Sequence, residues 1–342
     1  MQTNGLDITR LKTDGSHYVA ISFNLPYHLE LPEDNYEVKV KLSDKEIIVQ
    51  VILEHHKEQI DEMLKKPVDK YSDRFYSTVS AYVPLRFNDM SFHSNFRKVE
   101  SVVFDKHEEF RKIGIHSVNR LILIYRHFTG DFHIRSITSL NDFSLAILFN
   151  ENSPQNPTSH LKAYGKKYYT TESILRYTTD LPTLMIEKLK KKLLNITTVS
   201  LVNELLLNAY SFLDEGNFRL AIIEAETAFE VAIGHFLLDH YKGDTDKIQW
   251  LERQNSFTNL LNSNEAEVAF SSHSKSFKKN NQLYALWEKN VWKVRGSIVH
   301  GKTIDVPYPI AAKALKTIEE VLENLLERPR TKLRNYATYK IE

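Results

Sequence analysis

The residues of this chain that are best suited to chemistry are an arginine and a histidine near the end of an expected helix. Arg295 and His300 are separated by four residues, and Gly301 follows the histidine directly. An arginine guanidinium binds phosphate through a planar fork of N–H donors, and an imidazole gains and loses a proton near neutral pH. Together the two residue types favour acid–base chemistry at a phosphate group.

The helix expected over residues 280–299 would not by itself place these two side chains on one face. A step of five residues turns about 500° around a straight α-helix, which leaves the side chains roughly 140° apart. Gly301 fits a left-handed C-cap, and a frayed or tightened last turn could swing His300 towards Arg295. Alternatively, a second subunit could complete the site by packing its helix end against the first.

Two stretches in the second half of the chain resemble a known family. The stretch from Leu286 to Gly301 resembles the terminal motif of HEPN domains, in which a histidine follows an arginine after a short spacer. The stretch from Gly216 to Ile233 is similar to the central helix of the Apea-like branch of that family. The resemblance covers roughly residues 183–330. It departs from the family at Gly296, where Asn, Asp or His is frequent.

The resemblance implies an all-α HEPN-like bundle that forms a homodimer and cleaves RNA without a metal ion or cofactor. In such an enzyme the ribose 2′-hydroxyl attacks the neighbouring phosphate, and the product ends in a 2′,3′-cyclic phosphate. His300 would transfer protons and Arg295 would hold the phosphate, while Glu230 corresponds to an acidic position common in similar sequences. A role in antiviral defence or stress response is implied by the resemblance as well.

Local basic clusters could guide RNA to this site, because a net charge of +1 gives no chain-wide attraction to nucleic acid. The residues expected to bind RNA phosphates are Lys275, Lys278, Lys279 and Lys302. A solvated helix face explains each lysine equally well. The lysines therefore support RNA binding only if they flank the Arg295 cleft.

Two alternatives assign the helical region or the whole chain a different role. Arg295 could pair with Glu288 or Glu230 while His300 only bonds the helix end, which leaves a noncatalytic module that dimerises, acts as a scaffold or binds a nucleotide. Gly296 favours that alternative. In the other, the N-terminal domain carries the main function, but the sequence identifies neither a catalytic set nor a ligand there.

The first 150 residues are expected to form a strand-rich mixed α/β domain. Apolar and charged residues alternate from Tyr36 to Leu42, which is typical of a half-buried strand. Apolar steps of three and four residues predict a helix over residues 115–128. Runs of similar strand character predict further strands at residues 18–25, 47–53, 76–83, 132–137 and 143–149. We expect one antiparallel sheet.

Residues 151–182 are expected to be a loop or linker, since Pro154 and Pro157 lie among small polar residues at its start. Residues 183–330 should form the helical domain and residues 331–342 a tail, so the fold class is α+β. Helices are expected from Leu201 to about residue 214, where Gly216 fits the left-handed cap position, and over residues 218–241, 246–262, 280–299 and 308–327. The helix over residues 218–241 should be central, because it is apolar over much of its circumference. Its apolar stripe comprises Leu220, Ile223, Thr227, Val231, Gly234 and Leu238, and it is widened by Ile222, Ala225, Phe229, Ala232, Ile233 and Phe236.

The composition is that of a globular chain, with 42% hydrophobic and 26% charged residues. Zero cysteines exclude disulfides, cysteine-ligated zinc and thiol nucleophiles. The sequence begins without a signal-peptide pattern and has no apolar run long enough to span a bilayer, so we expect a cytoplasmic protein with no membrane partner. No metal ligand set, phosphate-binding glycine loop or nucleophile elbow is recognised.

Overall fold

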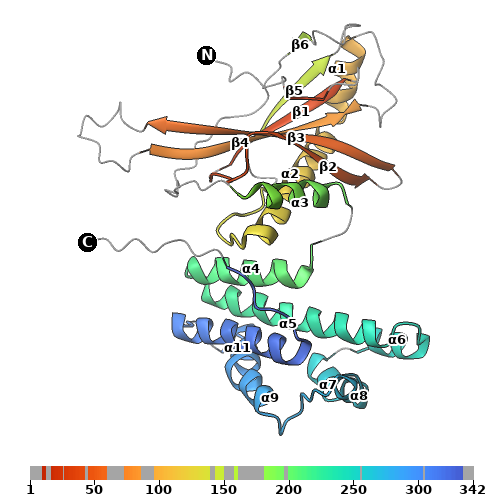
Figure 1. The fold of residues 1–342 in the computed structure, drawn as a ribbon, viewed down its shortest axis with the longest axis vertical. Helices are drawn as coiled ribbons and strands as arrows, with labels where there is room; N and C mark the ends of the chain where they lie inside the picture. The colour runs from red at the N-terminus through yellow and green to blue at the C-terminus, as the bar shows by residue number, and fades with distance from the viewer. Residues whose placement is uncertain are drawn as a thin grey trace, which may run out of the picture. The chain divides into compact units, whose positions relative to one another are not determined.

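The computed structural model describes residues 10–12, 17–25, 27–42, 45–59, 73–85, 96–138, 143–149, 158–160, 181–195, 199–254, 256–302 and 305–333. The chain divides into two compact units. The first comprises Met1–Phe128 and Ile134–Thr197, and the second comprises Thr129–His133 and Thr198–Glu342. The architecture is mixed α+β, with a sheet in the first unit and helices in the second (Figure 1).

The first unit is built on a six-stranded antiparallel sheet with the order β2-β3-β4-β1-β5-β6. The strands expected at residues 18–25, 36–42, 47–53, 76–83 and 143–149 are confirmed, and β3 and β4 extend beyond the expected ranges. The strands are β1 (Tyr18–Leu25), β2 (Asn35–Leu42), β3 (Lys45–Gln59), β4 (Asp73–Pro84), β5 (Phe143–Phe149) and β6 (Thr158–His160). Central strand β1 is buried along nearly its whole length.

Three helices belong to the sheet unit: α1 (Phe96–Asp105), α2 (His107–Thr129) and α3 (Thr183–Leu193). Helix α2 begins eight residues before the expected start, and Glu108 and Glu109 in its first turn complement the helix dipole. It packs closely on β1, because a Cβ atom at Gly114 would lie 3.2 Å from the Cβ of Ile21. A side chain at position 114 would require the Ile21 side chain or the helix to shift by a few tenths of an ångström.

The expected strand over residues 132–137 is wrong. This segment has no regular structure in the part of the chain that the structure describes. The Asn119 side chain of α2 instead satisfies the backbone of Ile137, donating to its carbonyl at 2.8 Å and accepting from its amide at 2.7 Å. A side-chain amide here replaces the partner that a sheet ladder would have supplied.

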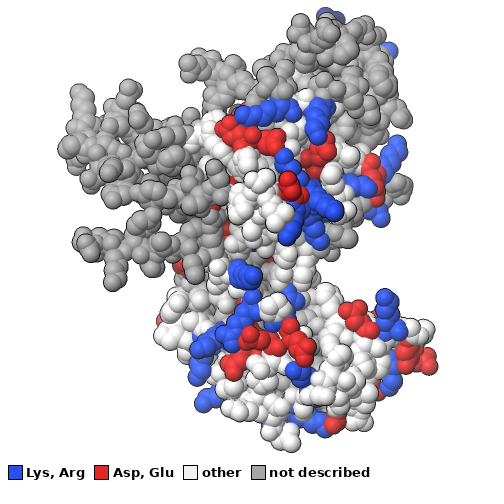
Figure 2. All heavy atoms as spheres, in the orientation of Figure 1, with Lys and Arg blue, Asp and Glu red and all other residues white. Residues whose placement is uncertain are grey.

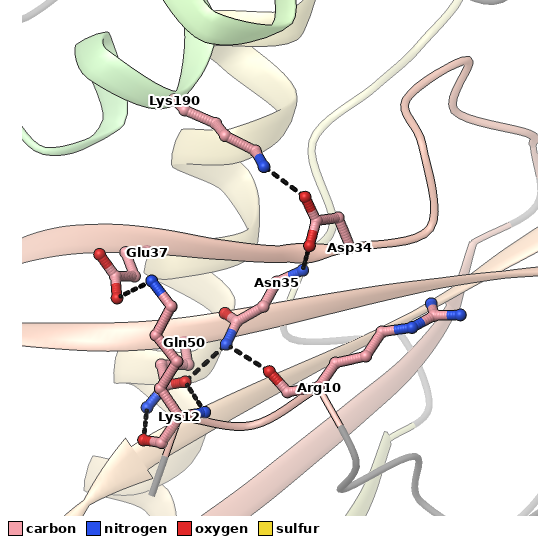
Figure 3. Close-up of polar contacts among 7 residues, drawn as sticks. All are labelled: Arg10, Lys12, Asp34, Asn35, Glu37, Gln50 and Lys190. Atoms are coloured by element: carbon pink, nitrogen blue, oxygen red, sulfur yellow. Dashed lines mark hydrogen bonds and ion pairs between the residues drawn. The ribbon is translucent and has the colours of Figure 1, made fainter. Parts of the chain in front are cut away.

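The segment Arg10–Lys12 is fastened to the sheet by a buried carboxamide pair (Figure 3). Gln50 of β3 accepts from the Lys12 amide and donates to its carbonyl, both at 2.8 Å. Asn35 of β2 donates to Gln50 at 2.6 Å and to the Arg10 carbonyl at 2.9 Å. Gln50 thus makes with Lys12 the two hydrogen bonds that a residue of a paired strand would make. Nearby, Asp34 forms an ion pair with Lys190 of α3.

The second unit is helical, and its helix predictions are confirmed at the two ends of the region but not in the middle. The expected helices over residues 246–262 and 280–299 are each divided, and a helix at α8 was not expected. Ser256 and Ser263 cap α7 and α8 with their side chains, which explains the break within residues 246–262 and the start of α8. The break within residues 280–299 is a π-helical turn. The elements are α4 (Leu201–Asp214), α5 (Phe218–His240), α6 (Thr245–Glu252), α7 (Phe257–Leu261), α8 (Asn264–Ser272), α9 (Gln282–Trp287), the π-helix η2 (Glu288–Trp292), α10 (Lys293–Val299) and α11 (Tyr308–Leu326).

Helices α4 and α5 form a hairpin whose turn is made by Gly216. This glycine has φ +77°, as the sequence predicted, and the Asn217 amide donates back to the Phe212 carbonyl at 2.8 Å. Helix α5 packs against α4, α10 and α11, so it is central. The predicted apolar surface of α5 is buried only in part. Leu220 and Leu238 of the stripe are 46% and 41% exposed, whereas five of the six residues expected to widen it are buried. The buried face carries Ala221, Ile222, Ala225, Glu226, Ala228, Phe229, Ala232, Ile233 and Leu237.

Candidate functional site

Arg295 and His300 lie on a helical stretch that is interrupted by a π-turn. Helix α9 passes into the π-helix η2 and then into α10 without leaving a helical path. Within η2, the buried Asn290 side chain donates to Thr317 Oγ1 of α11 at 3.2 Å. One extra residue in a helical turn rotates everything after it by about 100°, so η2 determines the direction in which Arg295 points. Such π-turns often occur at functional sites.

A buried carboxylate of α5 holds the first tryptophan of this stretch. The Trp287 indole N–H donates to both oxygens of Glu226, at 3.0 and 3.3 Å. Both residues are buried, Glu226 at 1% exposure and Trp287 at 0%. The pKa of Glu226 is raised to about 8. Burial is the largest cause and neighbouring Glu230 adds to it, while the Trp287 hydrogen bond and the charge of Arg295 oppose the rise.

The Arg295 side chain is half-buried and lies over the ring of Trp292, with its guanidinium carbon 5.7 Å from the ring centroid. A cation above a tryptophan face is attracted by the ring quadrupole. Among the described residues, the guanidinium has no hydrogen-bond or ion-pair partner. Glu288, a partner considered from the sequence, pairs with Lys293 at 3.1 Å instead.

Glu230 is the candidate residue that the structure brings into electrostatic range of Arg295. It follows Glu226 by one helical turn, so both carboxylates lie on the same side of α5. Burial raises the pKa of Glu230 above its ordinary value, and the positive charge of Arg295 offsets part of this rise. The carboxylate and the guanidinium thus influence each other within one cluster.

His300 is the exposed C-cap residue of α10. Its amide donates to the Gly296 carbonyl at 3.1 Å, so the helical path continues as far as His300. Gly301 has φ +67°, which confirms the predicted left-handed cap, and the Lys302 amide donates to the Ser297 carbonyl at 2.8 Å to close it. The Gly301 amide bonds the Ile298 carbonyl at 3.1 Å, so the tightening of the chain comes only at the cap after His300. Because the α-helical bond from His300 to Gly296 is kept, His300 and Arg295 leave the helix about 140° apart within one chain.

The four lysines expected to bind RNA fall into two groups. Lys275 pairs with Glu327 at 3.3 Å, and Lys278 pairs with Glu267. Lys279 and Lys302 are exposed. Lys278 and Lys279 both line a half-open cavity of about 410 Å³ beside α7 and α8. On the face of the second unit seen in Figure 2, basic and acidic side chains lie side by side, so the lysines of that face do not form a purely basic surface.

The sequence interpretation missed Glu226 and the role of Trp292. Glu226 could have been found, because a glutamate four residues before Glu230 lies within a helix that is apolar over most of its circumference, and a buried carboxylate requires a partner. The π-turn has no recognisable sequence pattern. Its stabilising contact, between Asn290 and Thr317, joins two helices that are well separated in the sequence.

No family model, curated protein or solved structure matches this chain. Function is therefore inferred from the side chains and their surroundings. Within the described residues, no group of three His, Asp or Glu side chains could hold a metal ion. No described helix is both long enough and apolar enough to cross a membrane.

Proposed function

We propose that the helical unit is a metal-independent endoribonuclease of the HEPN type. The observation that supports this most strongly is the half-buried Arg295 guanidinium, which rests on Trp292 and has no counter-ion within ion-pair distance among the described residues. A guanidinium in that situation retains donors for a phosphate. RNA in the cytoplasm is the proposed substrate, and defence or stress response is the proposed setting.

In the proposed reaction, the 2′ oxygen attacks phosphorus and the bond from phosphorus to the 5′ oxygen breaks. Arg295 stabilises the negative charge on the phosphate oxygens. His300 donates a proton to the leaving 5′ oxygen, a role to which an imidazole side chain is suited. Glu230, whose pKa is raised by burial, is the group beside Arg295 that can accept the proton of the 2′-hydroxyl.

The proposed enzyme is a homodimer in which one chain supplies Arg295 and the other supplies His300. The roughly 140° between these residues on α10 supports this arrangement, because one helix end cannot aim both at a single phosphate. Val299, next to His300 in the sequence, is 52% exposed and would be covered in such a dimer. The N-terminal unit would then sense a partner or restrain cleavage.

A second candidate function is a noncatalytic module that dimerises or binds a nucleotide. Glu230 favours it, since a carboxylate beside the guanidinium can offset its charge. Gly296 also favours it, because the polar side chain frequent at this position in HEPN domains is missing. Both candidate functions use Arg295, but only the first requires His300.

A cleavage assay in excess chelator separates the two candidates. Single-stranded and structured RNA are incubated with wild type, Arg295→Ala and His300→Ala, and with the exposed controls Arg219→Ala and His235→Ala. The nuclease proposal predicts that the first two substitutions reduce the rate by roughly a hundredfold or more and that the controls leave it unchanged. If Arg295→Ala and His300→Ala both cleave RNA at the wild-type rate, Arg295 and His300 are not the catalytic residues. RNA binding without cleavage would favour the second candidate.

A further inference from the structure

Glu226 is a buried ionisable group that the proposed reaction does not use. Its carboxylate is 1% exposed and lies in the core of the second unit among Ala225, Phe229 and Trp287. A buried carboxylate without partners is costly, and here the partner is the indole N–H of Trp287. An indole N–H can donate to either protonation state, so Glu226 can gain or lose its proton without breaking this contact.

A continuous series of contacts leads from Glu226 to Arg295. The Trp287 ring lies 5.5 Å from the Trp292 ring, and the two planes are inclined by 30°. The Arg295 guanidinium lies on the other member of this pair, Trp292. The position of the guanidinium thus depends on a ring pair that Glu226 fixes from the core.

We propose that Glu226 is a positioning residue for Arg295. It anchors the Trp287–Trp292 ring pair beneath the guanidinium, and its proton determines how much of the arginine charge remains available to a phosphate. When Glu226 is protonated it is neutral. Of the two glutamates, Glu230 alone can then place a negative charge beside Arg295. The ionised carboxylate adds a second negative charge and reduces the attraction of Arg295 for a phosphate.

The groups that surround Glu226 make this titration a local property of the cluster. Arg295 of α10 and Glu230 of α5 act on it electrostatically, and Trp287 of α9 acts through its hydrogen bond. Other carboxylates packed around α5 act elsewhere: Glu204 of α4 on Glu224, and Glu319 of α11 on Tyr210. The burial that raises the pKa of Glu226 to about 8 brings its ionisation into an accessible pH range.

The test follows the indole N–H signal of Trp287 by ¹⁵N NMR in the full chain, which has three tryptophans. Trp287→Phe assigns the signal. A charged acceptor makes a stronger hydrogen bond than a neutral one, so we expect the signal to move downfield with a midpoint near pH 8. Glu226→Gln keeps an acceptor but cannot ionise, and should abolish the movement. Glu224→Gln, at another half-buried glutamate of α5, is the matched control and should leave the midpoint unchanged.

Coupling to Arg295 is measured with the same signal. Arg295→Ala should raise the midpoint and Glu230→Gln should lower it, each by roughly half a pH unit or more. The proposal is overturned if Arg295→Ala does not move the midpoint, or if Glu226→Gln and Glu224→Gln have equal effects. Thermal melting of each variant at pH 6 separates these results from loss of the fold.

The effect of Glu226 on phosphate binding rests on the proposed function. A separate experiment tests it, so its failure can be distinguished from failure of the coupling between Glu226 and Arg295. RNA affinity is measured by fluorescence anisotropy from pH 6.5 to 9 for wild type and Glu226→Gln. We expect several-fold weaker binding by wild type as Glu226 ionises and a flatter profile for the variant. Parallel profiles would overturn the phosphate part of the proposal. A chain that binds no RNA at any pH would defeat the proposed function, and the indole titration would still decide whether Glu226 and Arg295 are coupled.

Discussion

The Arg295 guanidinium lies over the ring of Trp292, 5.7 Å from its centroid, while Lys293 takes the nearby carboxylate of Glu288. Two residues that are close in sequence thus have different electrostatic partners. Lys293 is neutralised at the surface, and Arg295 is directed onto an aromatic face beside two carboxylates of α5. The proposed phosphate site depends on this separation.

Removing the charge of Glu230 should strengthen RNA binding. Its carboxylate competes with a phosphate for Arg295, and a partly exposed charge pair is worth about 0.2–1 kcal/mol. Glu230→Gln should therefore bind single-stranded RNA roughly two- to fivefold more tightly, as measured by anisotropy at low salt. If Glu230 also accepts the 2′-hydroxyl proton, the same variant cleaves more slowly. Weaker binding by Glu230→Gln would mean that the carboxylate organises the site instead of competing within it.

The stability of the helical unit should depend on pH through Glu226. The native state keeps the Glu226 proton up to about pH 8, whereas the ordinary glutamate pKa is 4.5. Between these values the native state holds a proton that the unfolded state has lost, so the free energy of unfolding decreases as pH rises. Each pKa unit corresponds to about 1.4 kcal/mol, so the loss amounts to a few kcal/mol.

Urea unfolding followed by tryptophan fluorescence measures this loss, because Trp250, Trp287 and Trp292 all lie in the second unit. Wild type should lose more stability than Glu226→Gln between pH 5 and pH 8.5. The difference between the two proteins removes contributions from other titrating groups. Equal losses in both proteins would show that Glu226 ionises in the native state as an ordinary glutamate does.

Lys278 and Lys279 should contribute differently to RNA binding although they are adjacent. Lys278 is paired with Glu267, whereas Lys279 is exposed and lines the same cavity. Lys279→Ala should reduce the slope of log affinity against log salt by about 0.7, the value for one contact to a single strand. Lys278→Ala should reduce it by less. Equal slopes for wild type and Lys279→Ala would place the RNA away from this lysine.

The dimeric arrangement predicts that two inactive variants restore activity when mixed. In a heterodimer of Arg295→Ala with His300→Ala, one composite site keeps both wild-type side chains. Random pairing should restore about a quarter of wild-type activity, because half of the dimers are mixed and each has one intact site. The measurement is the cleavage rate after the two proteins are unfolded together and refolded. A mixture as inactive as its components would mean that each site uses one chain only.

Local patterns predicted the strands and helix ends that depend on neighbouring residues. The alternation around Tyr36–Leu42, the cap at Gly216 and the cap at Gly301 are all set by residues within a few positions. The expected strand over residues 132–137 failed because Asn119, a residue of α2, bonds the backbone of Ile137. Sequence periodicity contains no information about such a distant side chain.

The candidate site was only partly predictable for the same reason. Arg295, His300 and Glu230 could be selected from residue type and resemblance, and the helix end at Gly301 followed from its glycine. The direction of Arg295 could not be predicted, because it depends on the π-turn of η2 and on the contact between Asn290 and Thr317. The buried face of α5 was predicted only as part of a wider apolar surface, because this helix is apolar around most of its circumference and the packing of α4, α10 and α11 selects one side.

The most direct test of the central claim uses one RNA sequence in two forms, with and without its 2′-hydroxyl groups. Purified wild-type protein is incubated with each form in excess chelator, and the product ends are identified by mass spectrometry. We predict cleavage of the ribose form alone, with 2′,3′-cyclic phosphate ends and no cleavage by Arg295→Ala. Cleavage of the deoxy form, a requirement for added metal, or no cleavage of either form would contradict the claim.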